Sequence, residues 1–210
     1  PLYLISILGI CMTLFIVLSC LIGPVKIPLD RFFEDKYAEI LRLRFLRMML
    51  AIVAGAGLSL AGAVLQGLLR NPLAEPYILG VSSGSGLGAV LGLLFFSAAA
   101  AANILAFICG VITIILVYRL AKVGSRLFPE NMVISGILVN ALFSSLLMFL
   151  ISNSSGPKVH SIIWWLLGNL QVYSGMQVSV AGGVVLAGFF ITLIFSKELN
   201  ALSLGEEDAM

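Results

Sequence analysis

The stretch LLRNPLAEPYILGVSSGSG, residues 68–86, decides how this chain folds, because its polar centre separates two long apolar runs. Residues 48–69 and residues 76–118 contain no charged side chain. An apolar stretch of about 20 residues is long enough to cross the hydrocarbon core of a bilayer as a helix. The arginine, asparagine, glutamate and two prolines therefore predict a connection between two membrane-spanning helices.

The composition excludes a water-soluble globular protein. Of the 210 residues, 60% are apolar and 10% are charged, with a mean hydropathy of +1.13, whereas soluble domains carry about 25% charged residues. The formal net charge is +2, and no block of Lys and Arg alternates with aromatic residues, which excludes a nucleic-acid-binding surface. The sequence therefore predicts a polytopic helical membrane protein.

The charge-free runs predict six spanning helices, all-α, within a single domain of residues 1–210. The run after Pro76 is long enough for two helices and is divided near FFSAAAAANI. The expected spans are approximately residues 2–23, 48–69, 77–96, 103–118, 131–151 and 177–196, followed by a polar segment at 197–210. The first run lacks a basic leader and exceeds the about 7–15 residues of a signal-peptide core, so we interpret it as a retained span. Trp164 and Trp165 favour an interfacial helix, because indole prefers the headgroup level.

The basic residues do not decide the orientation of the chain in the membrane. Six spans place successive connections on alternate sides, which divides Lys and Arg into two groups. One side holds Arg70, Arg119, Lys122, Arg126 and Lys197, and the other holds Lys26, Arg31, Lys36, Arg42, Arg44, Arg47 and Lys158. Because basic residues normally gather in cytoplasmic connections, the second group requires another explanation.

The expected spans contain glycine and small polar residues in place of charges. Asp, Glu, Lys, Arg and His are costly within the hydrocarbon and mark proton pathways or voltage sensors, and the six expected spans contain none. Gly80, Gly84, Gly88 and Gly92 recur at every fourth position, which predicts a helix ridge where another backbone approaches closely. The small polar residues either support helix packing or line a path for a bulky polar solute. The candidates for such a path are Gln66, Ser82, Ser83, Asn140 and Ser144.

No cofactor, metal or catalytic site is expected on this chain. The GSGLG of residues 84–88 lacks a preceding strand and a following Lys-Ser/Thr, so it does not predict phosphate binding. If ATP drives transport, another chain binds ATP and Mg²⁺. Cys11, Cys20 and Cys109 lie in apolar runs without a ligand-spaced partner and are interpreted as buried small hydrophobic residues.

Residues 43–92, from LRFLRMML to GAVLG, closely resemble the signature region of the permease subunits of ATP-binding-cassette importers for iron-siderophore complexes, haem and vitamin B12. Three later segments resemble the same family in the same order: FPENMVISGILVNALFSSLLM, SIIWWLLGNL and LNALSLGEEDAM. Members of this family have ten spans. The resemblance therefore covers the first two-thirds of such a permease and implies a chain that stops inside the cytoplasmic coupling segment.

The resemblance implies roles for the polar segments. LLRNPLAEPY would be the cytoplasmic turn in which Asn71 and Pro72 end one helix and Pro76 begins the next. The family's arginines that receive acidic residues of the soluble binding protein match Arg44 and Arg47, with Leu46 in place of the usual proline. The matched contact with the ATPase comprises Asn200, Ala201, Leu202, Ser203, Leu204, Gly205, Glu206 and Glu207. The matched cytoplasmic gate comprises Pro129 and Glu130.

The resemblance also implies partners and a location. They are a second permease copy forming a homodimer, an ATP-binding subunit, an extracytoplasmic substrate-binding protein and the lipid of the cytoplasmic (inner or plasma) membrane. The alternative is a passive channel or secondary carrier, which the absence of intramembrane charges and the coupling-like tail disfavour. A third hypothesis is that this segment is inactive alone, because four family spans are missing. Ferric siderophore, haem and cobalamin all remain as the solute.

Overall fold

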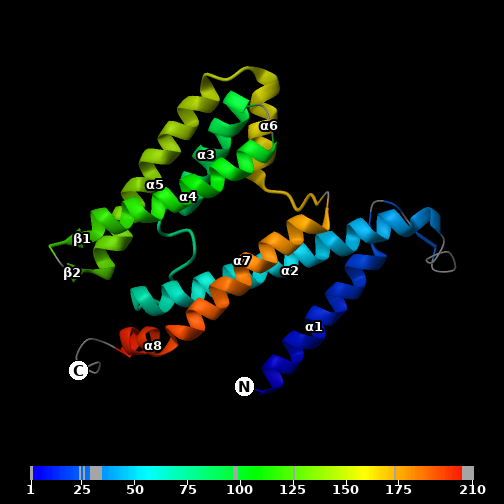
Figure 1. Cartoon of the computed structure of the whole chain (residues 1–210), viewed down its shortest axis with the longest axis horizontal. Helices are drawn as coiled ribbons and strands as arrows, with labels where there is room; N and C mark the ends of the chain where they lie inside the picture. Colours follow the sequence, from blue (N-terminus) through cyan, green and yellow to red (C-terminus); the bar gives the residue numbers. More distant parts are fainter. Residues whose placement is uncertain are drawn as a thin grey trace. The chain divides into compact units, whose positions relative to one another are not determined.

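The computed structural model describes residues 2–23, 25, 27–28, 35–96, 99–124, 126–172 and 174–204 (Figure 1). Eight helices and one short hairpin occur among these residues. In chain order they are α1 (Leu2–Leu21), α2 (Asp35–Leu69), α3 (Val81–Phe96), α4 (Ala99–Ala121), β1 (Lys122–Val123), β2 (Arg126–Leu127), α5 (Pro129–Ser152), α6 (Gly156–Leu167), α7 (Gly175–Ile194) and α8 (Ser196–Leu204). The predicted helical bundle is confirmed, and the antiparallel hairpin between α4 and α5 is an addition to the all-α prediction.

Five helices, α1, α2, α4, α5 and α7, are long and apolar enough to cross a membrane. The sixth expected span corresponds to α3, which has only 16 residues and a length of about 24 Å at 1.5 Å per residue. It begins at Val81 because Glu75–Gly80 forms two successive turns, closed by hydrogen bonds from Ile78 N–H to Glu75 O (3.1 Å) and from Gly80 N–H to Tyr77 O (2.9 Å). The expectation that Pro76 begins this helix is therefore wrong.

Helix α2 begins at Asp35, thirteen residues before the expected span. Its first turns carry Arg42 and Glu39, which form an exposed ion pair at 3.3 Å. The charged side chains keep this part of α2 out of the hydrocarbon core, but they do not prevent it from being helical. Leu46 preserves the helical hydrogen bonds at the position where the resemblance expects proline, which would have lacked the N–H. The charge-free run of residues 48–69 therefore predicts the apolar part of α2, but it does not predict where the helix begins.

The chain divides into two compact units, and both α2 and α7 contribute to each. Unit 1 comprises Pro1–Gly57 and Leu170–Ile191, and unit 2 comprises Leu58–Asn169 and Thr192–Met210. In unit 1, Val185 of α7 lies 3.0 Å from the position that a Cβ on Gly57 of α2 would occupy. Glycine here lets the two helices approach, as small residues do in membrane helix pairs.

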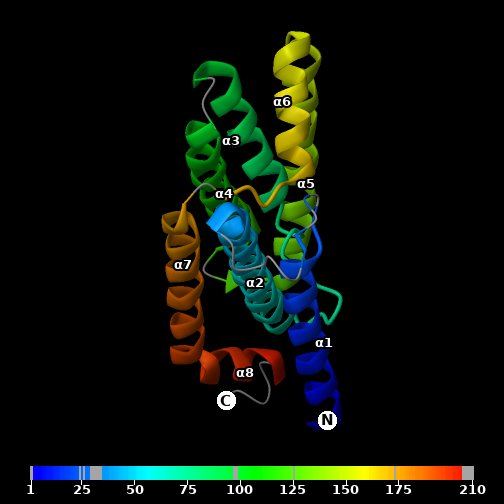
Figure 2. The same cartoon turned by 90° about the vertical axis from the view of Figure 1, so that its right-hand side faces the viewer.

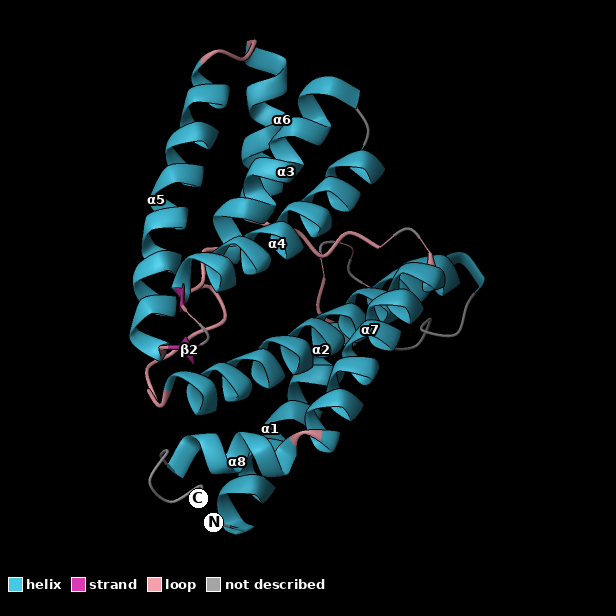
Figure 3. Ribbon diagram, turned by 60° about the vertical axis from the view of Figure 1, so that its left-hand side comes forward, coloured by secondary structure: helices cyan, strands magenta, loops and turns pink. Residues whose placement is uncertain are grey.

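In unit 2, α3 packs against α4, α5 and α6, and α4 also packs against α5 (Figure 3). The closest pair is α3 with α4, which lie side by side (Figures 1 and 2). A Cβ at Gly92 would lie 2.6 Å from Ala102 Cα, and one at Gly84 or Gly88 would overlap α4 as well. The glycine ridge therefore faces α4, which allows backbone contact that larger side chains would prevent.

Gly80 does not belong to that ridge. It precedes α3 with φ of +72°, a left-handed conformation that glycine adopts without steric cost. Its Cα faces α5, where a Cβ would lie 3.1 Å from Gly136 O. The expectation of four glycines on one helix face is corrected to three, because the turn before Val81 redirects the first one toward α5.

Candidate functional site

The turn after α2, residues 70–80, lies in unit 2 and is held by several backbone and side-chain hydrogen bonds. Helix α2 ends in a Schellman motif, in which Arg70 N–H donates to Gly67 O (3.3 Å) and Asn71 N–H donates to Gln66 O (3.1 Å). Arg70 occupies the position where such motifs usually have glycine, and its φ is +50°. It is the only non-glycine residue with positive φ in the described part of the chain. The left-handed conformation costs an L-residue about 1–2 kcal/mol.

Side chains fix the turn internally. Asn71 Oδ1 accepts a hydrogen bond from Leu73 N–H (2.9 Å), and Ala74 N–H donates to Asn71 O (3.0 Å). Gln66, a predicted path residue, reaches across from α2 and donates through Nε2 to Pro72 O (3.1 Å) and Ala74 O (3.4 Å). Its amide therefore holds the turn closed.

The turn is also seated in the hydrophobic core of unit 2. Ala74 and Leu79 are buried together with residues from α2, α4 and α5, namely Leu69, Val117, Ala121, Met132 and Val139. Leu73, in contrast, is 86% exposed at the tip. The turn thus presents Leu73, and less fully Tyr77, outward from a fixed base.

Helix α8 lies against the C-terminal end of α2 (Figures 1 and 2). Arg70 Nε–H donates to Leu202 O at 2.6 Å, and Leu199 O lies 4.0 Å from the position of a Cβ on Gly67. The predicted coupling residues Asn200–Leu204 form the end of α8, where Ser203 Oγ donates to Asn200 O (2.7 Å). The other three, Gly205, Glu206 and Glu207, lie outside the described residues.

Arg44 and Arg47, the predicted docking residues, both bond to backbone carbonyls in unit 1. Arg44 Nη1 donates to Cys20 O (2.8 Å) and Leu21 O (3.3 Å), and its Nη2 donates to Val25 O. Cys20 and Leu21 are the last residues of α1, so the half-buried guanidinium serves as its C-terminal cap and also binds the chain that follows at Val25. Exposed Arg47 uses only Nε, which donates to Leu170 O (3.1 Å), and its two amino groups make no hydrogen bond to a described residue.

Three of the seven basic residues in the second group, Arg44, Arg47 and Lys158, donate to backbone carbonyls within the chain. Lys158 of α6 repeats the pattern of Arg44, since its Nζ donates to Leu94 O (3.0 Å) in the last turn of α3. The last carbonyls of a helix lack partners within it and carry a partial negative charge, so a cation from elsewhere in the chain stabilises them. Helix capping therefore gives Arg44 and Lys158 a structural role, while their positive charges remain and leave the orientation undecided.

The other predicted path residues do not converge on one cavity. Ser83 is buried and donates to Gly80 O (2.9 Å), inside the helix start. Ser82, Asn140 and Ser144 are exposed, and Asn140 and Ser144 share one face of α5 at a spacing of four residues. Both side chains are exposed, although the backbone of Asn140 lies beside buried Gly80.

The predicted gate residues stand at the N-terminus of α5, directly after the hairpin. Pro129 occupies the first turn, and Glu130 is the acidic residue of that turn, where a carboxylate interacts favourably with the helix dipole. Gly124 closes the hairpin with φ of +61°. The pair thus has a local structural role in starting α5.

Helix α6 contains a contact that the sequence did not indicate. Trp165 Nε1–H donates to Asn103 Oδ1 of α4 (3.1 Å), and Ile162 is fully buried. Trp164 is exposed and donates to His160 Nε2 (2.7 Å). The predicted interfacial helix thus exposes one tryptophan and packs the other against α4.

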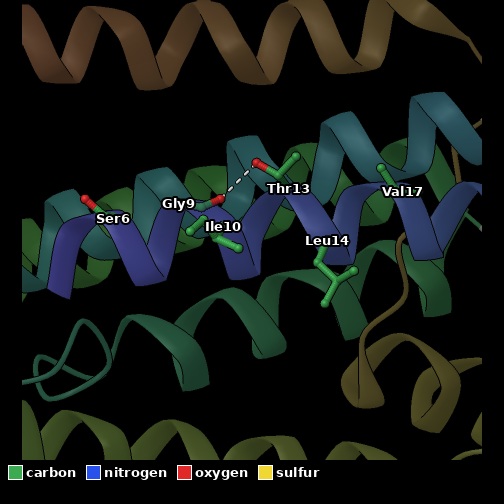
Figure 4. Close-up of a pocket in the computed structure, with 6 residues that line it drawn as sticks. All are labelled: Ser6, Gly9, Ile10, Thr13, Leu14 and Val17. Carbon is green, nitrogen blue, oxygen red and sulfur yellow. Dashed lines mark hydrogen bonds between the residues drawn. The ribbon is translucent and has the colours of Figure 1, made fainter. Parts of the chain in front are cut away.

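A shallow open groove runs along α1 and is lined by Ser6, Gly9, Ile10, Thr13, Leu14 and Val17 (Figure 4). Thr13 Oγ1 donates to Gly9 O (2.9 Å) within the same helix, so the hydroxyl is already satisfied. Among the described residues, no group of His, Cys, Asp and Glu could hold a metal ion. The groove therefore has the character of a helix-packing surface.

The comparisons with known proteins agree with this architecture. Residues 11–210 match the FecCD transport family. The chain is 36% identical over 168 residues to the cobalamin import system permease protein BtuC of Halobacterium salinarum, covering 80% of this chain and 45% of that protein. It is 34% identical over 219 residues to the Fe(3+)-citrate import system permease protein YfmE of Bacillus subtilis, covering 99% and 64%.

A solved structure has a similar fold. It is an inward-facing conformation of an ABC transporter assigned to the metal-chelate type, with a TM-score of 0.78 and 30% identity over 95% of this chain and 64% of that one. The chain thus spans 45 to 64% of the length of these proteins.

Proposed function

Because the chain belongs to the FecCD transport family, we propose that it is part of the membrane-spanning permease of an ATP-driven importer. The match over residues 11–210 carries this proposal. The chain is a multi-pass protein of the cytoplasmic membrane, and its apolar helices supply the crossing segments. It performs no covalent chemistry, since ATP and Mg²⁺ bind to a separate ATP-binding subunit.

The solute that we propose is a bulky metal chelate, such as a ferric siderophore, haem or cobalamin. The names of the relatives support this class, because the cited proteins import cobalamin and Fe(3+)-citrate. Asn140 and Ser144 on the exposed face of α5 are the residues that we assign to the path. In a homodimer this face would meet its counterpart, and the two copies would enclose the path between them.

The extracytoplasmic binding protein docks on Arg47 in this proposal. Its two unused amino groups suit a bidentate contact with a carboxylate. Arg44 supports the docking surface indirectly, because its three hydrogen bonds hold the end of α1 beside α2. At the opposite end of α2, α8 contacts the ATP-binding subunit, with Pro129 and Glu130 at the cytoplasmic gate.

The proposal is tested by the ATPase activity of the full-length permease, reconstituted with its ATP-binding subunit and its binding protein. The binding protein is loaded in turn with ferric siderophore, haem or cobalamin. We expect one load to stimulate hydrolysis selectively. Solute uptake that persists with an inactivated ATP-binding subunit would instead favour a passive channel or secondary carrier.

A further inference from the structure

Arg70 combines an unfavourable backbone conformation with a contact distant in the sequence. It stands at the glycine position of the Schellman motif with φ of +50°, although glycine or asparagine would adopt this conformation more easily. Residues held in rarely populated backbone conformations are often functional, so the side chain of Arg70 is of interest. In this conformation the guanidinium reaches α8 and donates a hydrogen bond to Leu202 O.

The contact is well placed to hold α8. Arg70 Nε–H donates to Leu202 O at 2.6 Å across 132 positions of sequence. Leu202 lies in the last turn of α8, whose carbonyls lack partners within the helix. A cation there satisfies a carbonyl and also interacts favourably with the negative end of the helix dipole. Charge-assisted hydrogen bonds of this kind are stronger than neutral ones.

The other side of the contact is anchored. Arg70 continues directly into the turn that Gln66 closes through Pro72 O and Ala74 O, and Ala74 is buried in the core of unit 2. A displacement of Leu202 would therefore act on the end of α2 and on the core beneath the turn. The side chains of Arg119 and Arg126, which are also exposed in unit 2, make no hydrogen bond or ion pair to a described residue.

We propose that Arg70 is a positioning residue that links α8 mechanically to the C-terminal end of α2. This inference rests on the proposed function, in which α8 contacts the ATP-binding subunit. When that subunit displaces α8, the guanidinium carries the displacement to α2 and to the α2–α3 turn. The arginine occupies a glycine position because this contact offsets the backbone strain.

Arg70→Gly separates the two roles of the residue. Glycine relaxes the left-handed backbone, so relief of strain taken alone predicts unchanged or improved thermal stability. The link predicts a different result for α8, namely faster hydrogen exchange of its backbone amides by about tenfold, the effect of losing one hydrogen bond to a charged group. Arg70→Asn tests the same point with a second residue that tolerates positive φ, and Arg126→Gln is the control for loss of a basic residue.

The measurement uses the full-length transporter in lipid nanodiscs. Hydrogen exchange of α8 is followed by mass spectrometry, and uptake per ATP hydrolysed is measured in proteoliposomes with radiolabelled cobalamin, ferric citrate and haem. We expect Arg70→Gly and Arg70→Asn to accelerate exchange in α8 and to lower uptake per ATP several-fold, about 3-fold or more. Arg70→Lys should recover part of both effects, and Arg126→Gln should change neither.

Wild-type exchange rates in α8 of Arg70→Gly would overturn the link, whatever the transporter carries. Faster exchange with unchanged uptake per ATP would reduce Arg70 to a local cap and overturn its role in coupling. If the wild-type complex shows no ATP-dependent uptake of any probe, the proposed function fails, and the inference about coupling fails with it. The exchange data then still report whether the contact exists, so the two failures are distinguishable.

Discussion

At the scale of single residues, polar side chains in this chain mostly serve backbone carbonyls. Arg44, Lys158 and Arg70 each donate to the last carbonyls of a helix other than their own. Gln66 does the same for a turn. These donors stabilise the fold because a backbone carbonyl without a hydrogen bond is costly near the hydrocarbon.

Arg44 and Arg47, in the third and fourth turns of α2, should respond differently to substitution. Arg44→Gln removes donors from the end of α1, so we expect a loss of about 1–3 kcal/mol in stability, seen as a lower thermal midpoint of the purified protein. Arg47→Gln should leave the thermal midpoint near its wild-type value and weaken the affinity for the binding protein. Surface plasmon resonance with the loaded binding protein checks the second effect. A wild-type affinity in Arg47→Gln would remove it from the docking surface.

Gln66 should matter for stability rather than for transport selectivity. Gln66→Leu keeps the size of the side chain but removes both hydrogen bonds to the turn, so we expect destabilisation of about 1–2 kcal/mol. Thermal unfolding followed by intrinsic fluorescence measures it. Ser82→Ala is the control, because Ser82 is exposed on α3 and its side chain makes no hydrogen bond to a described residue. We expect it to leave the thermal stability unchanged. If Gln66→Leu changed the solute preference and kept wild-type stability, the prediction would be wrong, and Gln66 would be assigned to the translocation path.

At the scale of elements, glycine decides which helices meet. Gly84, Gly88 and Gly92 face α4 closely, while Gly80 faces α5 from the turn before α3. The repeat of four was visible in the sequence, but the partner was not. Periodicity identifies a face of a helix, whereas the partner depends on where the preceding turn directs the chain.

Substitutions on this ridge should be more damaging than the same change elsewhere. Gly88→Ala places a Cβ against Leu105 O and Cys109 of α4, and backbone atoms cannot move aside easily. Overpacking of this kind costs about 1–3 kcal/mol, and we expect lower expression and a lower thermal midpoint. Gly183→Ala in α7, where a Cβ would meet nothing within 4 Å, is the matched control. Equal behaviour of the two variants would contradict the packing of α3 on α4.

At the scale of the whole molecule, the connections between helices must lie on alternate sides of the membrane if every spanning helix crosses it. Helix capping gives Arg44 and Lys158 a structural role inside the chain. In the proposed function the α2–α3 turn, which contains Leu73, is cytoplasmic. The connection between α5 and α6 is expected outside because the short helix α3 is counted as a crossing together with α4 and α5.

Cysteine labelling tests this orientation. We expect Leu73→Cys to react with a membrane-impermeant maleimide only in inside-out vesicles, because its side chain is 86% exposed at the turn. Ser155→Cys, between α5 and α6, should react only in right-side-out vesicles. The parent protein controls for Cys11, Cys20 and Cys109, which lie within helices. Labelling of both positions from one side would contradict the expected number of crossings between them.

The sequence by itself determined the class of the molecule, because charged residues are costly in hydrocarbon and the composition contains few of them. Of the six spans that it predicted, five correspond to helices that are long and apolar enough to cross a membrane. It also indicated the family through the ordered segments around residues 43–92. The tertiary structure alone decided what the polar residues bond to: Arg44 to the end of α1, Gln66 to the turn, and Arg70 to α8. Those contacts join positions that are close only after folding, and a hydrogen bond depends on distance and direction, which no local pattern of residue types contains.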